Sequence, residues 1–227
     1  MKMEQMKDLL EKLRDIEPAT IGHFVEAGAM DPRIKPLFDD AKIVGRAVTV
    51  RISGSDSTAL HCVMGQVGPG DVVVVDRMGN DTHACTGEVV ALAAKCRGAE
   101  GIIIDGPATD PLAIREMNLP VFCTGISVLT TKLLGLGGEI NVPIQCGGVP
   151  VFPGDIIIAD VCGVLVLKPE QVAALAEAAL KSEEKEVGLK EKLRNGGVLP
   201  ELTGAANLDN TLVKEFIAKV RFSKSNS

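Results

Sequence analysis

The chain has 227 residues, 46% of them hydrophobic, and carries a formal net charge of −6 at pH 7. This length suits one large domain or two small ones, and the apolar content suffices for a buried core. An acidic chain with six Phe and no Trp or Tyr lacks the cationic surface and the stacking side chains that nucleic-acid binding uses. Direct nucleic-acid binding is therefore not expected.

The N-terminal region predicts two helices within residues 1–30. Residues 3–16 place apolar side chains three and four positions apart, as an amphipathic helix does. Pro18 ends this helix, and Thr20 can cap a second one that runs to about Ala27. The region lacks the apolar core of a signal peptide, and no apolar run reaches the roughly 20 residues of a membrane span. We expect a soluble, cytoplasmic protein without a membrane partner.

The centre of the chain alternates strands with helices. Strand patterns occupy residues 43–52, 72–76 and 101–105, and helix patterns occupy 58–67, 87–98 and 111–118. Two continuously apolar strands that flank a helix are typical of a parallel crossover unit. Because ligands bind beyond the carboxyl ends of such strands, the loops 76–88 and 105–110 are expected to line one cleft.

The C-terminal third changes this pattern. Residues 139–168 hold three or four short strands between Gly and Pro turns, and antiparallel pairing is expected there. A long charged helix from about Pro169 to Asn195 follows, and 212–220 forms a last amphipathic helix. The whole pattern predicts an α/β fold with a central mixed sheet, a core at 43–168 and C-terminal helices within 169–222.

The six cysteines do not suggest disulfides or a zinc site. They stand at positions 62, 85, 96, 123, 146 and 162, without a CxxC pair. Most lie in apolar runs, and free cysteine is among the most buried residue types. The expected state is a set of reduced thiols in the core.

Acidic residues gather around the predicted cleft. They are Asp76, Asp81, Glu88, Asp105 and Asp110. Converging carboxylates repel one another unless a cation lies between them, and a hard divalent ion such as Mg²⁺ or Mn²⁺ suits oxygen ligands. Structural roles stay open: Asp76 and Asp105 can form turns or cap helices, and Glu88 can stabilise the first turn of its helix.

Gly87 precedes the same helix and lets a ligand approach the backbone closely. The free N–H groups of a first helical turn form an anion site, which would hold a small carboxylate without a basic side chain. The sequence has no GxGxxG after a strand and no Walker loop, so nucleotide binding has no support.

Several ordered blocks resemble the "regulator of ribonuclease E activity A" (RraA-like) family. They are GPGDVVVVD, GIIIDGPATD, PLAIREMNLPVF and VPVFPGDIIIADVCGVLVLKPEQV. This family includes the class II 4-hydroxy-4-methyl-2-oxoglutarate/4-carboxy-4-hydroxy-2-oxoadipate aldolases; its legacy label, demethylmenaquinone methyltransferase, has no supporting motif here. The resemblance implies one domain over residues 1–227, a sandwich of the swivelling ββα type with N-terminal helices and a long C-terminal helix, and homotrimers or homohexamers with clefts between subunits.

The aldolases of this family share an acid, twenty residues and then Arg-Asp, which correspond here to Glu88, Thr109 and Asp110. The resemblance implies that Asp110 binds Mg²⁺ or Mn²⁺ directly. Glu88, and Glu186 of a neighbouring subunit with Glu184 as the next candidate, would act through water. The implied catalytic residues are Glu88, Thr109 and Asp110, and the implied substrate-binding residues are Gly87, Glu88, Val89, Val90 and Thr109.

Thr109 departs from this pattern. The family's Arg neutralises the enolate that forms when the carbon–carbon bond breaks, whereas threonine offers one neutral hydroxyl. Loss of such a donor typically costs about 10² to 10³ in rate. Arg77, Arg115 or His83 could supply the missing charge.

Two functions therefore compete. The first is a metal-dependent lyase that cleaves or decarboxylates a 4-substituted 2-oxo acid, such as a hydroxy-oxo diacid or oxaloacetate, and releases pyruvate. In one form of this hypothesis, Thr109 contacts an altered substrate. The alternative is a non-catalytic regulator that binds an endoribonuclease or a helicase.

Overall fold

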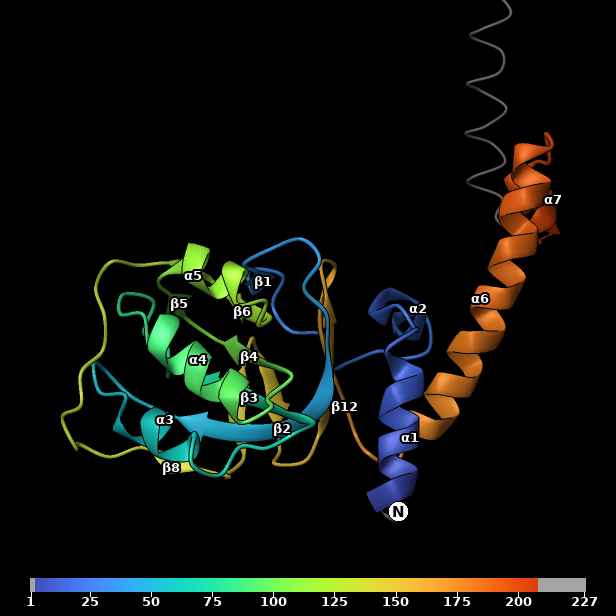
Figure 1. Ribbon diagram of the computed structural model, residues 1–227. Helices are drawn as coiled ribbons and strands as arrows, with labels where there is room; N and C mark the ends of the chain where they lie inside the picture. Colours follow the sequence, from blue (N-terminus) through green and yellow to red (C-terminus); the bar gives the residue numbers. More distant parts are fainter. Residues whose placement is uncertain (1–2, 208–227) are drawn as a thin grey trace, which may run out of the picture. The chain divides into compact units, whose positions relative to one another are not determined.

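The computed structural model describes residues 3–207, and Figure 1 shows its elements. The chain divides into two compact units between Leu180 and Lys181. The predicted helix at 212–220 lies outside the described residues.

The observed elements follow the predicted order. The helices are α1 (Met3–Leu13), α2 (Pro18–Gly22), α3 (Thr58–Val63), α4 (Glu88–Cys96), α5 (Pro111–Glu116), α6 (Val172–Arg194), α7 (Leu199–Leu202) and the 3₁₀ helix η1 (Ala205–Asn207). The strands are β1 (Lys35–Pro36), β2 (Ile43–Arg51), β3 (Asp71–Asp76), β4 (Gly101–Ile104), β5 (Pro107–Ala108), β6 (Val121–Cys123), β7 (Gly125–Ile126), β8 (Glu139–Ile140), β9 (Ile144–Cys146), β10 (Val149–Val151), β11 (Ile156–Asp160) and β12 (Gly163–Leu167).

The main sheet is mixed, which confirms the predicted fold class. Its order is β1-β6-β4-β3-β2-β11-β12, and β8 also pairs with β2. Strands β2, β3, β4 and β6 run parallel, whereas β11 pairs antiparallel with β2 and with β12. The region 139–168 holds five short strands rather than the three or four expected, because β8 and β9 are separate two- and three-residue segments.

Strand β3 explains the continuously apolar runs in the sequence. Val73 and Val75 belong to the hydrophobic cluster that α3 and α4 share with the sheet, and Val72 and Val74 belong to a second cluster with β9 and β10. All four side chains are fully buried. A strand covered on both faces does not alternate apolar with polar residues.

Helix α4 forms the crossover between β3 and β4 (Figure 1). It buries Val90, Ala91 and Ala94 against the sheet. It ends at Cys96, and Gly98 follows the C-cap Arg97 with a φ of 84°, in line with the glycine preference after helix C-termini. This crossover carries the chain from the end of β3 to the candidate site and back to the sheet.

Helix α2 differs from the prediction. It begins at Pro18 and ends at Gly22, without a side-chain cap from Thr20. Thr20 is buried, and Pro18 starts the helix because its fixed φ suits the first helical position. Ile21 then packs with Leu13 of α1 and with Ala176 of α6 in the third hydrophobic cluster.

The cysteine prediction was only half correct. All six cysteines are free; Cys85, Cys123 and Cys146 are buried, whereas Cys62, Cys96 and Cys162 are exposed. Cys62 and Cys96 lie on the outer faces of α3 and α4, and Cys162 lies in the β11–β12 turn. Among residues 3–207, no helix has both the length and the apolar character needed to cross a membrane.

Candidate functional site

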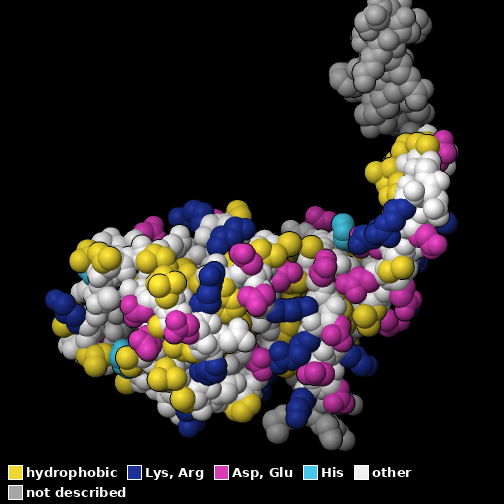
Figure 2. All heavy atoms as spheres, turned by 45° about the horizontal axis from the view of Figure 1, so that its top comes forward, with side chains coloured by type: hydrophobic (Ala, Val, Ile, Leu, Met, Phe, Trp, Pro, Cys, Tyr) yellow, Lys and Arg dark blue, Asp and Glu magenta, His cyan; other side chains and the backbone are white. Residues whose placement is uncertain are grey.

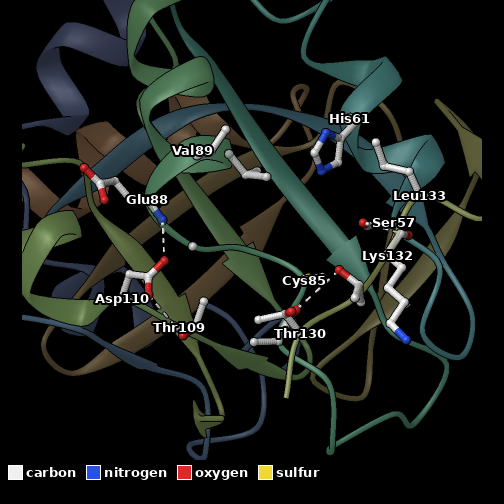
Figure 3. A pocket seen from close by; sticks show the side chains of 14 residues that line it. Ser57, His61, Cys85, Glu88, Val89, Thr109, Asp110, Thr130, Lys132 and Leu133 are labelled. Carbon is white, nitrogen blue, oxygen red and sulfur yellow. Dashed lines mark hydrogen bonds between the residues drawn. The ribbon is translucent and has the colours of Figure 1, made fainter. Parts of the chain in front are cut away.

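A cavity of about 330 Å³ is lined by residues that follow β2, β3 and β4. Figure 3 shows it with Asp110, Thr109 and Glu88 on one side and His61, Ser57 and Lys132 on the other. The two loops expected to converge therefore do so, through residues 84–88 of the first and 109–110 of the second.

Asp110 caps the N-terminus of α5 in a left-handed conformation, with φ 52° and ψ 46°. Asp tolerates this region better than most residues because its short polar side chain can bond locally. Its Oδ2 accepts the main-chain N–H of Glu88 (3.1 Å), and its Oδ1 accepts the Thr109 hydroxyl (3.3 Å). Because a carboxylate has about four acceptor sites, this exposed side chain can still bind a cation.

Gly87 permits the contact between the two loops. A Cβ at this position would lie 2.5 Å from Asp110 Oδ2 and 2.7 Å from Thr109 Cγ2. The Thr109 N–H also donates to the Thr86 carbonyl (2.9 Å). Glycine is therefore required for the close approach of Asp110 to the N-terminus of α4.

Glu88 contributes its backbone to this arrangement. Its N–H bonds Asp110, while Figure 3 shows its exposed side chain directed away from the Asp110 carboxylate. The Glu88 N–H is thus already engaged, unlike the free donor that the sequence suggested. The first-turn N–H groups of Val89 and Val90 have no carbonyl one turn earlier within α4 and stay suited to an anion.

The opposite wall combines α3 with the segment that follows β7. Lys132 is fixed by its main chain: its N–H donates to Ser55 (2.7 Å), and its carbonyl accepts the Ser57 N–H (2.9 Å). His61 lies on α3, where its N–H donates to the Ser57 carbonyl (3.0 Å). One short stretch, residues 55–57, thus positions both basic residues.

Asp56 holds this wall together. Its buried carboxylate accepts the Thr58 hydroxyl (2.6 Å) and the N–H groups of Thr58 (2.9 Å), Leu134 (3.1 Å) and Leu136 (2.7 Å). The Thr58 hydroxyl, followed by these backbone donors, lowers the pKa of Asp56. We call this arrangement the Asp56 clamp.

Three of the five predicted acids do not line the cavity. Asp76 accepts the Met78 N–H (2.8 Å) and pairs with Arg51 (3.2 Å). Asp105 accepts the Gly147 N–H (2.8 Å), and Asp81 is exposed in the loop after β3. Asp76 therefore has the turn role that the sequence left open, whereas Asp105 joins two segments 42 residues apart instead of forming a turn or capping a helix.

None of the three proposed substitutes for the family Arg lines the cavity. Arg77 is fully buried, and its Nη2 donates to the carbonyls of Gly54 (2.9 Å) and His83 (3.0 Å). Arg115 is exposed on α5 and lines a different hollow. The basic residues at the cavity are instead His61 and Lys132, which the sequence analysis missed.

Glu186 lies on α6 in the second unit, where it pairs with Lys190 (2.9 Å). Residues 3–207 contain no group of three His, Cys, Asp or Glu side chains that could hold a metal. Among the described residues, Asp110 and Glu88 bring exposed carboxylates to the cavity, which fits Mg²⁺ because this ion uses one or two carboxylates and keeps several waters. The carboxylates that one chain supplies thus fit a divalent cation that keeps most of its water ligands.

Comparison with known proteins identifies the family. Residues 10–166 match the RraA-like family, described as Aldolase/RraA. Since the match covers more than half of the chain, the protein belongs to this family. The resemblance seen in the sequence is confirmed.

Curated and solved relatives agree with this assignment. A Halalkalibacterium halodurans protein, named as a candidate 4-hydroxy-4-methyl-2-oxoglutarate aldolase, is 40% identical over 150 residues, which are 66% of this chain and 71% of the relative. The crystal structure of Streptomyces coelicolor RraAS2, titled an unusual member of the RNase ES inhibitor RraA family, has a TM-score of 0.74 and 27% identity, covering 82% of this chain and 98% of that one. The RNA-processing inhibitor RraA of Thermus thermophilis has a TM-score of 0.62 and 27% identity, with coverages of 67% and 93%.

Proposed function

We propose that this protein is a divalent-metal-dependent lyase that releases pyruvate from a 4-substituted 2-oxo acid. The observation that carries the proposal is the contact between Asp110 and the N-terminus of α4 across Gly87. It places a carboxylate for a cation beside N–H groups for an anion, the two features that a metal-chelated 2-oxo acid needs. The names of curated relatives as aldolases support the same class of reaction.

Asp110 would hold Mg²⁺ or Mn²⁺ directly, and Glu88 and Glu186 of a neighbouring subunit would hold it through water. When bound, the metal supplies Lewis acidity at the 2-oxo group. The N–H groups of Val89 and Val90 would bind the substrate carboxylate at the first turn of α4.

In the aldol reaction the C3–C4 bond of the substrate breaks. The C4 hydroxyl passes its proton to water near Glu88 and becomes a carbonyl, while the bonding electron pair moves to C3 and gives the pyruvate enolate, which takes up a proton. In oxaloacetate the same bond breaks with loss of carbon dioxide. Thr109 lines the cavity beside Asp110. Its neutral hydroxyl would turn from Asp110 Oδ1 to donate to the enolate oxygen, which makes the reaction slower than with Arg.

The assembly would be a homotrimer or homohexamer. Two large exposed apolar side chains line the cavity, Val89 (74%) and Leu133 (63%). Others are exposed on α5, Leu112 (73%), and between β7 and β8, Val128 (92%) and Leu136 (77%). Figure 2 shows hydrophobic side chains at the left end of the molecule, where Figure 1 places α3, α5 and the segment before β8. Exposed apolar surface of this kind marks contact sites, and a second copy there would bring a further acid to the cavity.

The direct test is an assay of pyruvate release. Purified protein is incubated with Mg²⁺ or Mn²⁺ and either oxaloacetate or 4-hydroxy-4-methyl-2-oxoglutarate. We expect pyruvate above the metal-only background, and a chelator should remove the activity. No pyruvate from either substrate would contradict the proposal.

The alternative function is regulation of RNA processing. The titles of two solved relatives describe inhibitors of an RNase or of RNA processing, and Thr109 weakens the catalytic alternative. A binding measurement with an RNase E-type endoribonuclease or a helicase distinguishes the two. Tight binding with inhibition of RNA cleavage, in a protein that releases no pyruvate, would favour the regulator.

A further inference from the structure

We infer that the buried guanidinium of Arg77 supplies, from beneath the cavity, the positive charge that Thr109 does not carry. The inference rests on the proposed lyase function, in which an enolate forms beside two carboxylates. Arg77 does not touch the substrate and acts through its electric field. Such a field attracts any anion in the cavity and opposes any cation there.

Arg77 lies at the base of the three loops that line the cavity. Its Nη2 donates to the carbonyl of Gly54, after β2 (2.9 Å), and to that of His83, after β3 (3.0 Å). A Cβ at Gly106, after β4, would lie 2.6 Å from Arg77 Cγ. The side chain therefore packs against all three loops, each of which goes on to line the cavity.

The positive charge of Arg77 is not neutralised by an ion pair. The side chain is fully buried. Within residues 3–207 its Nε and Nη1 have no hydrogen-bond partner, and no acidic side chain pairs with it. The two carbonyls that it bonds are neutral. Because arginine stays protonated in proteins, a full positive charge remains beneath the cavity.

The effect of this charge reaches the cavity wall at Cys85. The buried side chain of Cys85 belongs to the first hydrophobic cluster and lines the cavity (Figure 3). Burial raises the pKa of the Cys85 thiol, and the positive charge of Arg77 opposes that rise. Since salt and water screen buried charges only weakly, the same guanidinium acts on an anion in the cavity.

The acids at the neighbouring strand ends face the other side of the sheet. Asp76 accepts the Gln145 N–H (3.3 Å). Asp105 accepts the Gly147 N–H (2.8 Å). These partners belong to β9 and to the turn after it, which cover the face of the second hydrophobic cluster. Neither acid is therefore placed beside Arg77 to cancel its charge.

The proposed reaction needs this positive charge. Asp110 and Glu88 bring exposed carboxylates to the cavity, which attract a metal but repel the substrate carboxylate and the enolate. Thr109 adds no charge to offset that repulsion. Arg77 offsets it without moving during the reaction, because its two hydrogen bonds fix the guanidinium in advance.

The test measures the binding of two ions of opposite charge by isothermal titration calorimetry. The probes are Mn²⁺ alone and oxalate in the presence of saturating Mn²⁺, since oxalate is a stable dianion that resembles the pyruvate enolate. Arg77→Met removes the charge and keeps a side chain of similar length. We expect the affinity for oxalate to fall about 10-fold and the affinity for Mn²⁺ to rise about 10-fold, the order of magnitude for one weakly screened charge.

The opposite signs distinguish charge from structure, because a distorted cavity would bind both ions more weakly. Weaker binding of both ions, or unchanged binding of both, would overturn the inference. Arg115→Met is the matched control, at an exposed arginine of α5. Water screens that charge, so each affinity should change by less than about twofold.

Two further variants keep the test decisive if Arg77→Met does not fold. Arg77→Gln keeps donors for the two carbonyls without the charge and should give the same opposite shifts. Arg77→Lys keeps the charge and should bind both ions as the wild type does, and loss of oxalate binding in a folded Arg77→Lys would overturn the inference. If Arg77→Met shows the opposite shifts but the wild type releases no pyruvate, the lyase proposal fails and the role of Arg77 stands.

Discussion

Asp110 and Lys132 stand on opposite walls of one cavity, and the two walls are built differently. The wall of Asp110 consists of the loops that leave β3 and β4, neighbouring parallel strands of the sheet. The wall of Lys132 is joined to α3 by the hydrogen bonds of the Asp56 clamp. One of them links Asp56 to Leu134, which lies 78 positions later in the sequence. The first wall follows from sheet geometry, whereas the second depends on one buried carboxylate.

This difference separates chemistry from support. Under our proposal, the sheet-borne wall binds the metal and the 2-oxo acid. The Asp56 clamp fixes the main chain of the opposite wall. Changes to the first wall should therefore affect the reaction directly, and changes to the second should act through the stability of the clamp.

The largest effect is expected from Asp110→Asn. It removes the carboxylate that we propose for direct metal binding, and Lewis acidity is worth several kcal/mol, so pyruvate release should fall about a thousandfold. Asp105→Asn is the matched control, because Asp105 also follows β4 but bonds the Gly147 N–H. Equal losses in the two variants, measured with folding checked by circular dichroism, would mean that Asp110 has no special role.

Thr109→Arg should act in the opposite direction. A guanidinium beside the enolate oxygen would restore the charge found in the family motif, and kcat should rise by about 10². Pyruvate release is measured as above, with Thr109→Lys as a control for charge without the planar fork. A fall in activity would instead indicate that Thr109 contacts a different substrate.

Gly87→Ala should have an intermediate effect. Its Cβ would meet Asp110 Oδ2 and Thr109 Cγ2, so the carboxylate must move and Mn²⁺ affinity should fall about tenfold. Isothermal titration measures this change. Gly125→Ala is the control because a Cβ there meets nothing within 4 Å; the same affinity in both variants would exclude the proposed constraint.

Asp56→Asn should have the smallest effect on the shared chemistry and a pH-dependent effect on stability. Hydrogen bonds from Thr58 lower the pKa of Asp56. Its stabilisation is therefore present above the unfolded value of about 3.9 and is lost as the pH falls further. Thermal melting should show a variant less stable by several degrees at neutral pH, and the difference should narrow below about pH 4.

The control for this experiment is Asp8→Asn, at an exposed acid on α1. It should melt like the wild type at every pH. A constant difference between wild type and Asp56→Asn from neutral to strongly acidic pH would refute the role of the ionised carboxylate.

Sequence patterns predicted the wall that carries Asp110 because strands and helices are recognised from residues close together in the sequence. The apolar runs of β3 and β4 reveal parallel strands, and binding beyond their carboxyl ends selects the loops 76–88 and 105–110, which hold Glu88 and Asp110. The pairing of these two acids came from the family resemblance. The direction of the Glu88 side chain and the use of its N–H by Asp110 were not predictable, since both depend on how closely Gly87 lets the loops approach.

Sequence patterns did not predict the wall that carries His61 and Lys132. His61 lies on α3, which falls within the helix predicted at 58–67, but the helix pattern does not distinguish a residue that lines a cavity from one on the outer surface. Lys132 lies in a segment that pairs through single bridges, such as Asp56 with Lys132. Hydrogen bonds between distant loops produce no periodic sequence pattern. The position of these two residues at the cavity is therefore visible only in the structure.

The most direct test of the central claim is a titration with Mn²⁺ followed by electron paramagnetic resonance, with and without pyruvate. We expect the wild type to bind Mn²⁺ more tightly when pyruvate is present, and Asp110→Asn to lose this binding while Asp105→Asn keeps it. Undiminished Mn²⁺ binding in Asp110→Asn, or a wild type whose Mn²⁺ affinity does not change with pyruvate, would show that Asp110 does not hold a metal that binds a 2-oxo acid.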